Sequence, residues 1–169
     1  NNFIDSYFIT THPDEIKTTI IKKKLNHLPI PVDENIEDLN IYENKNRYKD
    51  LFFALSHGVN FGKLKRGKTD EREIFIKLLI NKFSNINYNI LGISNESPKW
   101  NYDYFNELIK CKMALNLSRG KPLKLTSSNR IASLIGNGIY TFIHKGTQFN
   151  KIFDEDEVGS YTHINDLGS

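Results

Sequence analysis

Residues 115–143 constrain the fold most, because this short stretch carries the pattern of a loop and a helix between two strands. The apolar run at 113–117 is typical of a short strand, and a polar, cationic loop follows it. The loop ends at Ser127 and Ser128, whose hydroxyl groups can accept hydrogen bonds from the free N–H groups of a first helical turn. We therefore expect a helix of about three turns that stops at Gly-Asn-Gly, residues 136–138, a typical helix end.

A second apolar strand is expected at 139–143, directly after this helix. Strand, loop, helix and strand together form a βαβ unit, and its cationic loop then lies at the carboxyl end of the first strand. Ligands bind at that edge in open parallel sheets, and a helix N-terminus that faces the loop favours an anion. The stretch therefore predicts a binding site for an anion, usually a phosphate.

The composition is that of one folded domain. With 169 residues, of which 38% are apolar, the chain can bury a substantial core. Its mean hydropathy is −0.49 and no apolar run approaches membrane-spanning length, so we expect a soluble, cytoplasmic protein. A net charge of +3 is too small to indicate nucleic acid as the partner. The sequence starts at Asn1 rather than Met and shows no secretory leader, so we expect a piece of a longer protein.

Strands and helices alternate from about residue 50 onward. A compact apolar run predicts a strand at 50–56, further strands are expected at 88–93 and 158–161, and helical patterns lie at 71–83 and 102–110. This alternation is typical of an α/β fold. We predict a single domain that is a Rossmann-like three-layer sandwich with a parallel sheet.

The helix at 71–83 carries two further predictions. Asp70 and Glu73 have the spacing of a capping box at its start. The side of the helix that faces the core is expected to consist of four apolar residues, Ile74, Phe75, Leu78 and Leu79.

The residues before the α/β pattern are expected to be less regular. Apolar and polar residues predict a short strand at 3–9 and a helix at 14–25, and the polar residues 34–49 predict a surface linker or an irregular segment. We divide the chain into residues 1–27, the tail of a preceding domain or an N-terminal extension, and residues 28–169, the Rossmann-like domain.

A glycine-rich, cationic loop is expected directly after the strand at 50–56. Three glycines and four cations fall within residues 57–68. In a phosphate site, the glycines would let the backbone approach the ligand and the cations would offset its charge. The alternative is a basic surface loop, and the spacing matches neither a Walker loop nor the dinucleotide fingerprint. The residues that we expect to contact a donor or its phosphates are His57, Gly58, Asn60, Gly62, Lys63, Lys65 and Arg66.

The loop after the strand at 113–117 carries a second group of cations. Arginine offers a planar fork to a phosphate, and serine and asparagine offer directional hydrogen bonds to sugar hydroxyls. The alternative is that these residues only cap the helix and face solvent, but strand-to-helix loops commonly carry binding sites. The candidates are Arg119, Lys121, Lys124, Ser127, Ser128, Asn129 and Arg130.

Histidine and cysteine do not indicate a metal site. The five histidines show no ligand spacing, and His57 is the only one that we expect to contact a ligand. The single cysteine, Cys111, excludes an internal disulfide and a zinc site built from cysteines, and we expect it to be buried and inert.

The order of four segments in the sequence indicates a resemblance to a known protein family. They are Pro-Ile-Pro-Val-Asp at 29–33, an apolar strand with a glycine loop at 52–62, Lys-Met-Ala-Leu-Asn-Leu at 112–117, and the helix sequence that ends in Gly-Asn-Gly at 127–138. In this order they resemble the donor-binding, C-terminal half of glycosyltransferases built from two Rossmann-like domains, the GT-B architecture. The resemblance covers residues 28–167.

This resemblance implies transfer of a sugar from a nucleotide-sugar to a glycan, lipid or protein acceptor, without a metal or another cofactor. It implies that the pyrophosphate lies near Arg130 and the first glycine-rich loop. Many members bind the ribose hydroxyls with a Glu of the donor helix, and Ser133 stands at that position here, which leaves the donor nucleotide open.

The resemblance also implies the partners. They are the nucleotide-sugar and an acceptor domain of the same full-length chain, without which we expect this piece to be inactive. Peripheral membrane association of the full-length protein is left open, and no nucleic acid is expected.

Two other classes of function stay open. The chain could be a non-catalytic α/β module that binds a nucleotide or an anionic partner, with the basic loop as its docking surface. Nucleic-acid binding through residues 63–68 would show a steep dependence on salt and little preference for base or sugar.

Overall fold

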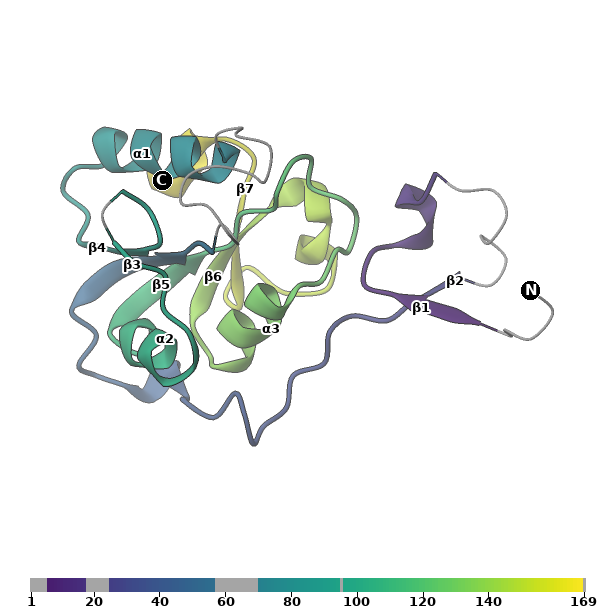
Figure 1. The fold of residues 1–169 in the computed structure, drawn as a ribbon, viewed down its shortest axis with the longest axis horizontal. Coiled ribbons are helices and arrows are strands. Elements are labelled where there is room, and N and C mark those ends of the chain that lie inside the picture. The colour runs from purple at the N-terminus through teal and green to yellow at the C-terminus, as the bar shows by residue number, and fades with distance from the viewer. Residues whose placement is uncertain (1–5, 18–24, 57–69, 95, 169) are drawn as a thin grey trace.

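A five-stranded parallel sheet is the centre of the protein, as a computed structural model shows for residues 6–17, 25–56, 70–94 and 96–168 (Figure 1). Each neighbouring pair of strands is parallel, in the order β4-β3-β5-β6-β7. The strands are β3 (Lys49–Ala54), β4 (Tyr88–Leu91), β5 (Cys111–Leu115), β6 (Tyr140–His144) and β7 (Val158–Tyr161). The predicted Rossmann-like α/β fold with a parallel sheet is confirmed.

The strand order places a binding crevice between β3 and β5. From β3 the chain goes outward to β4 on one side and then returns to β5 on the other side, after which β6 and β7 follow in sequence. The helices that come next in the chain after β3 and β5, at 71–82 and 129–136, lie on opposite faces of the sheet. In doubly wound sheets the ligand binds outside the carboxyl ends of the two strands where this reversal occurs.

Three helices cover the two faces of this sheet. Figure 1 shows α1 (Glu71–Lys82) on one face, and α2 (Asn101–Leu108) and α3 (Asn129–Gly136) on the other. Alternate residues of β3 point to opposite faces, so Phe53 belongs to the apolar cluster under α1 and Phe52 to the cluster under α2 and α3. Both side chains are at most 1% exposed, which explains why the strand is a continuous apolar run.

Helix α1 buries a different side from the predicted one. Ile74 and Leu78 are 49% and 57% exposed, whereas Arg72, Ile76 and Leu79 are its buried residues. The helix is apolar on nearly all sides, so the pattern alone did not identify the inner face, and the inner row begins with an arginine. Of the four expected core residues, Leu79 is buried as predicted and Phe75 is half-buried against the same cluster.

The predicted capping box of α1 is only half present. The Asp70 carboxylate accepts a hydrogen bond from the Arg72 N–H at 3.0 Å and so caps the helix. The Glu73 carboxylate pairs instead with the Lys77 ammonium, one turn further along the helix, at 2.7 Å.

Helix α3 and its surroundings follow the predicted strand–loop–helix–strand pattern. The helix has eight residues, about two turns rather than three. Its N-cap is Ser128, which accepts from the Ile131 N–H at 3.4 Å. β5 and β6, the strands that flank the helix, pair in parallel and form the predicted βαβ unit.

A second, two-stranded parallel sheet lies beside the loop that precedes α3 (Figure 1). It consists of β1 (Tyr7–Ile9) and β2 (Leu25–His27). The helix expected at 14–25 is wrong in its described parts, because only a 3-10 turn, η1 (Pro13–Glu15), forms there and Leu25 belongs to a strand. Two backbone bonds tie this unit to the loop, from Ser127 N–H to Thr10 O at 2.7 Å and from His12 N–H to Lys124 O at 3.0 Å.

Residues 34–48 are irregular and mostly exposed, as predicted, but one side chain of this segment reaches the core. The 3-10 turn η3 (Ile41–Glu43) places Ile41 in the core with no exposed surface. The buried Asn137, at the end of α3, holds this segment: its side-chain oxygen accepts from the Leu39 N–H at 3.2 Å, and its backbone oxygen accepts from the Ile41 N–H at 2.9 Å. A few specific contacts therefore fix a segment whose average composition is polar.

The remaining short elements lie along β6 and β7. They are the 3-10 turns η4 (Lys145–Thr147), η5 (Phe149–Lys151) and η6 (Ile164–Gly168). Phe149 packs with Ile131 of α3 and Val158 of β7 in a third apolar cluster, which fixes α3 against the end of the sheet.

Candidate functional site

Three adjoining cavities lie at the carboxyl ends of the strands. The largest, which we call the central cavity, has a volume of 470 Å³. It follows β5 and the start of α3, and none of its described lining residues is acidic. They are Arg72, Asn116, Leu117, Ser118, Arg119, Lys121, Leu123, Thr126, Ser128, Asn129 and Arg130.

Arg130 is held rigidly in the first turn of α3. Its Nη1 donates to the backbone oxygen of Leu117 at 2.9 Å, and its guanidinium carbon lies 5.4 Å from the centre of the Phe53 ring. Burial lowers the pKa of Arg130, and the nearby positive charge of Arg72 lowers it further. Arginine stays charged in proteins even so, and a partly desolvated, fixed cation attracts an anion more strongly than a solvated one.

Arg72 is fixed by Asp70, whose side chain is 2% exposed. Their bond is bidentate, with Nε at 2.9 Å from Oδ1 and Nη2 at 2.6 Å from Oδ2. The hydrogen bonds from Arg72 hold the pKa of Asp70 at about 2, well below its usual value. A second arginine, Arg119, lies with its Nη2 at 3.8 Å from the same carboxylate. Asp70 therefore orients Arg72 while both arginines border the central cavity.

The structure brings together five of the predicted residues of the second cationic loop. The residues of this group that line the central cavity are Arg119, Lys121, Ser128, Asn129 and Arg130. The N-terminus of α3 also faces it, which adds the partial positive charge of the helix dipole. Arg72 also lines the cavity but was not predicted as a site residue. The sequence feature that could have identified it is a charged residue in line with the apolar residues of an expected helix.

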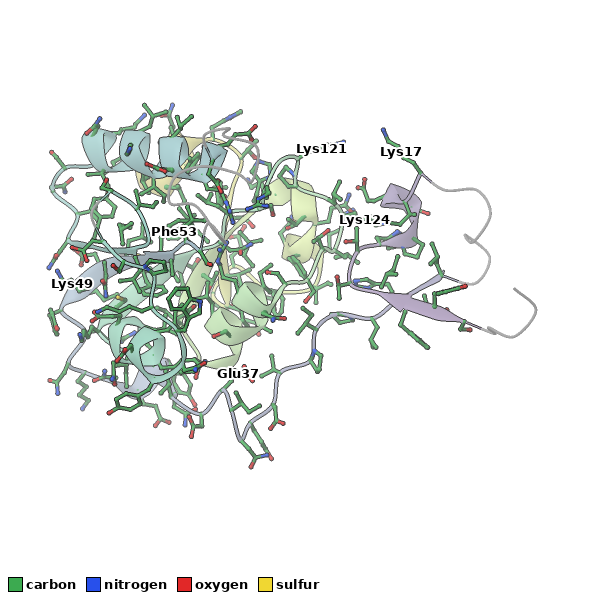
Figure 2. The ribbon with its side chains drawn as sticks, in the orientation of Figure 1. Lys17, Glu37, Lys49, Phe53, Lys121 and Lys124 are labelled. Carbon is green, nitrogen blue, oxygen red and sulfur yellow. The ribbon has the colours of Figure 1, made fainter. Side chains whose placement is uncertain are left out.

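Two predicted residues, Ser127 and Lys124, do not line the cavity. The Ser127 hydroxyl accepts from the Ile30 N–H at 2.9 Å, and the Lys124 ammonium lies 3.5 Å from Asp14. Figure 2 shows Lys124 between the loop and the N-terminal strands, while Lys121 lies further along the same loop. Ser127 and Lys124 therefore connect the N-terminal unit to the main domain and do not form the cavity.

The predicted residues of the glycine-rich loop are His57, Gly58, Asn60, Gly62, Lys63, Lys65 and Arg66, and all lie outside the described residues. Their part in a site stays a prediction.

A second cavity, the β3 cavity, has a volume of 430 Å³ and shares Asn129 and Arg130 with the central cavity. It extends from the end of β3 to the start of α2, where Trp100 is 61% exposed. Tyr104 packs edge-on against Phe52 with ring centres 5.3 Å apart, and burial raises its pKa. Ser133 lies in this cavity as well. Neither Trp100 nor Tyr104 was predicted as a site residue from the sequence, because dispersed aromatic residues usually belong to a core.

The third cavity, which we call the β7 cavity, has a volume of 250 Å³ and lies at the ends of β6 and β7. It shares Arg72, Leu117 and Ser118 with the central cavity. The three cavities therefore form a row along one edge of the sheet, with the arginines in the middle.

The described parts of the chain contain neither a cluster of metal ligands nor an exposed cysteine. Among these residues, no three His, Cys, Asp or Glu side chains gather where they could hold a metal ion. Cys111 is buried as predicted, and burial raises its pKa to about 11. No described helix is both long and apolar enough to span a bilayer.

Fold and site together define a Rossmann-like α/β domain with a cationic cavity at the reversal point of its sheet. Comparisons of the chain with models of protein families, with curated proteins and with solved structures find no match. What the domain binds must therefore be argued from its own cavities.

Proposed function

We propose that the chain is the nucleotide-sugar-binding domain of a glycosyltransferase. The observation that carries this proposal is the central cavity, where Arg72, Arg119 and Arg130 meet without an acidic lining residue in the described structure. A doubly charged diphosphate matches such a cavity, because the guanidinium N–H groups that are not bound to Asp70 or Leu117 can donate charge-assisted hydrogen bonds to phosphate oxygens.

The nucleoside would occupy the neighbouring β3 cavity. Asn129 and Arg130 border both cavities, so a ligand with its phosphates at Arg130 can continue directly into the β3 cavity. Trp100 and Tyr104 offer aromatic surface to a base, and Ser133, whose hydroxyl oxygen is buried at the wall of this cavity, would lie beside the ribose. A serine in place of a carboxylate makes this ribose contact neutral.

The proposed chemistry is electrostatic. When the bond between sugar and diphosphate breaks, negative charge grows on the departing β-phosphate. Arg130 and Arg72 are already fixed, by Leu117 and Asp70 respectively, so they stabilise this charge without first having to reorganise. The arginines would take the place of a divalent cation in this role.

The N-terminal strands support an acceptor domain as the partner. β1 and β2 are three residues each and pair in parallel, an arrangement too small to be stable as an independent sheet. Parallel strands usually belong to larger sheets that are buried on both faces. We propose that this pair belongs to the sheet of the acceptor domain and is held against the donor domain by Ser127 and Lys124.

One observation favours a binding module without catalysis as the second candidate. Asp70, the acidic side chain beside the central cavity, is paired with Arg72 and has a pKa of about 2, so it cannot serve as a general base at neutral pH. The two candidates differ in whether the full-length chain transfers a sugar, and the binding module could take either a nucleotide or another anionic partner.

The test is calorimetric titration of the protein with UDP, GDP and CDP. We expect one of them to bind selectively and Arg130→Ala to weaken it more than tenfold, because charge-assisted hydrogen bonds contribute about 1.5–3 kcal/mol each. Lys121→Ala, which removes an exposed cation from the same cavity, is the matched control and should cost much less. Melting temperatures show whether each variant is folded.

Two results would contradict the proposal. One is no binding of any nucleoside diphosphate at millimolar concentration, and the other is an affinity of the Arg130→Ala protein within about twofold of the unchanged protein. Binding of a short single-stranded oligonucleotide with a steep salt dependence, and of no free nucleotide, would support nucleic-acid binding instead.

A further inference from the structure

The β7 cavity has a chemistry different from that of the central cavity beside it. It is bounded by the start of α1, the loop after β5 and the last residues of β6 and β7. Its volume of 250 Å³ corresponds to roughly eight water molecules at about 30 Å³ each, which suits one small ring rather than a second nucleotide.

One wall of the β7 cavity is aromatic. Phe75 of α1 and Tyr161 of β7 lie with ring centres 6.2 Å apart, and His144 of β6 lies edge-on to Tyr161 at 5.3 Å. The Tyr161 hydroxyl donates to the backbone oxygen of Asn116 at 3.2 Å, so this ring is anchored to the loop after β5. Pro122 adds a further apolar surface.

His144 is held in one orientation. Its Nδ1 accepts a hydrogen bond from the Gly146 N–H at 2.9 Å, so the proton of the neutral ring is on Nε2, which can donate to a ligand. An added Cβ at position 146 would lie 2.9 Å from Nδ1 and would make the ring shift. The lining also includes polar groups that could meet a ligand's hydroxyls: the Glu71 carboxylate and the hydroxyls of Ser118 and Thr162.

We propose that the β7 cavity binds the glycosyl ring of the donor, a neutral ring with several hydroxyl groups. Such a ring has C–H faces that pack on aromatic side chains and hydroxyls that can accept from His144 and donate to Glu71. The carboxylate of Glu71 disfavours a further phosphate at this place, whereas the arginines of the central cavity favour one. The two cavities share Arg72, Leu117 and Ser118 as lining residues. A sugar ring in the β7 cavity can therefore be bonded to phosphates in the central cavity. This assignment rests on the proposed function and adds His144 and Glu71 as the residues that select the sugar.

The test compares each nucleotide-sugar with its own diphosphate. UDP, UDP-glucose, UDP-N-acetylglucosamine, GDP and GDP-mannose are titrated into the protein, His144→Ala and Glu71→Gln. For the pair that binds, we expect the ratio of sugar-nucleotide to diphosphate affinity to fall at least about fivefold in His144→Ala, while the diphosphate affinity itself stays within about twofold. Gly146→Ala, which displaces His144 without removing it, should lower the ratio in the same direction.

His163→Ala is the matched control, because His163 is an exposed histidine that does not line the cavity. An unchanged ratio in both His144→Ala and Glu71→Gln, with intact diphosphate binding, overturns the sugar subsite and leaves the proposed function standing. Absence of diphosphate binding in the unchanged protein overturns both. Melting temperatures of each variant separate a local loss from a failure to fold.

Discussion

Replacing Asp70 with asparagine tests the electrostatic centre of the domain. Asparagine is also a good N-cap, so Asp70→Asn keeps one oxygen that can accept from the Arg72 N–H. The variant loses the negative charge, the second acceptor oxygen of the bidentate bond to Arg72 and the attraction to Arg119. The variant therefore measures what this charge contributes to folding.

The size of the effect follows from the pKa of Asp70. Its shift from 3.8 to about 2 corresponds to about 2 kcal/mol of stability, at about 1.4 kcal/mol per pKa unit. Arg72 is also largely buried and would lose its partner, so we expect a total loss of about 2–4 kcal/mol at pH 7.

The effect has a defined dependence on pH. Because the folded protein lowers the pKa of Asp70, the stabilisation is complete above the unfolded value near 3.8 and disappears as the pH falls through the folded value of about 2. The contribution of the carboxylate should fall to about half by pH 3. Unfolding by denaturant at pH 7 and pH 3 measures it, with the exposed Asp156→Asn as control. Equal stability of Asp70→Asn and the unchanged protein at pH 7, or a difference that does not shrink at pH 3, would refute the reasoning.

Two further predictions concern packing. Ile41→Ala should destabilise the protein by about 2–4 kcal/mol, because Ile41 has no exposed surface, while Ile36→Ala, at a side chain 59% exposed, should cost little in the same denaturation assay; equal effects would contradict the packing of this segment. Gly92→Ala should destabilise by more than about 3 kcal/mol or prevent folding, because Gly92 has φ +76° and an added Cβ would lie 1.8 Å from the Leu55 oxygen. Gly120→Ala has a similar φ of +67° but open space around it, so its cost should stay near about 1 kcal/mol; equal melting temperatures of the two variants would contradict the close contact.

The sequence predicted the layers of the fold better than the details of its surface. The strand β3 and the βαβ unit around α3 were predictable because a compact apolar run and a Gly-Asn-Gly end are strong local signals. The side of α1 that faces the core was not, since the helix has apolar residues on nearly every side and only tertiary packing selects Ile76 over Ile74. The packing of Ile41 was missed for a related reason: it depends on Asn137, a residue 96 positions away in the chain.

The position of the candidate site could be predicted from the sequence, but the full set of residues that form it could not. Cations on the loop after a strand indicated the position of the central cavity, and Arg130 and Arg119 line it. The same rule also selected Lys124, which pairs with Asp14 of the N-terminal unit, because composition does not show which partner a lysine meets. Arg72 was missed since its orientation depends on the pairing with Asp70, and Trp100 was missed because only the topology brings α2 beside α3.

The most direct test of the donor-site proposal is a crystal structure of the protein with the nucleoside diphosphate that binds best. The account predicts that the diphosphate lies within hydrogen-bond distance of the Arg130 guanidinium and the N-terminus of α3, with the base against Trp100 in the β3 cavity. A diphosphate bound away from Arg130, or a base in the β7 cavity, would contradict it.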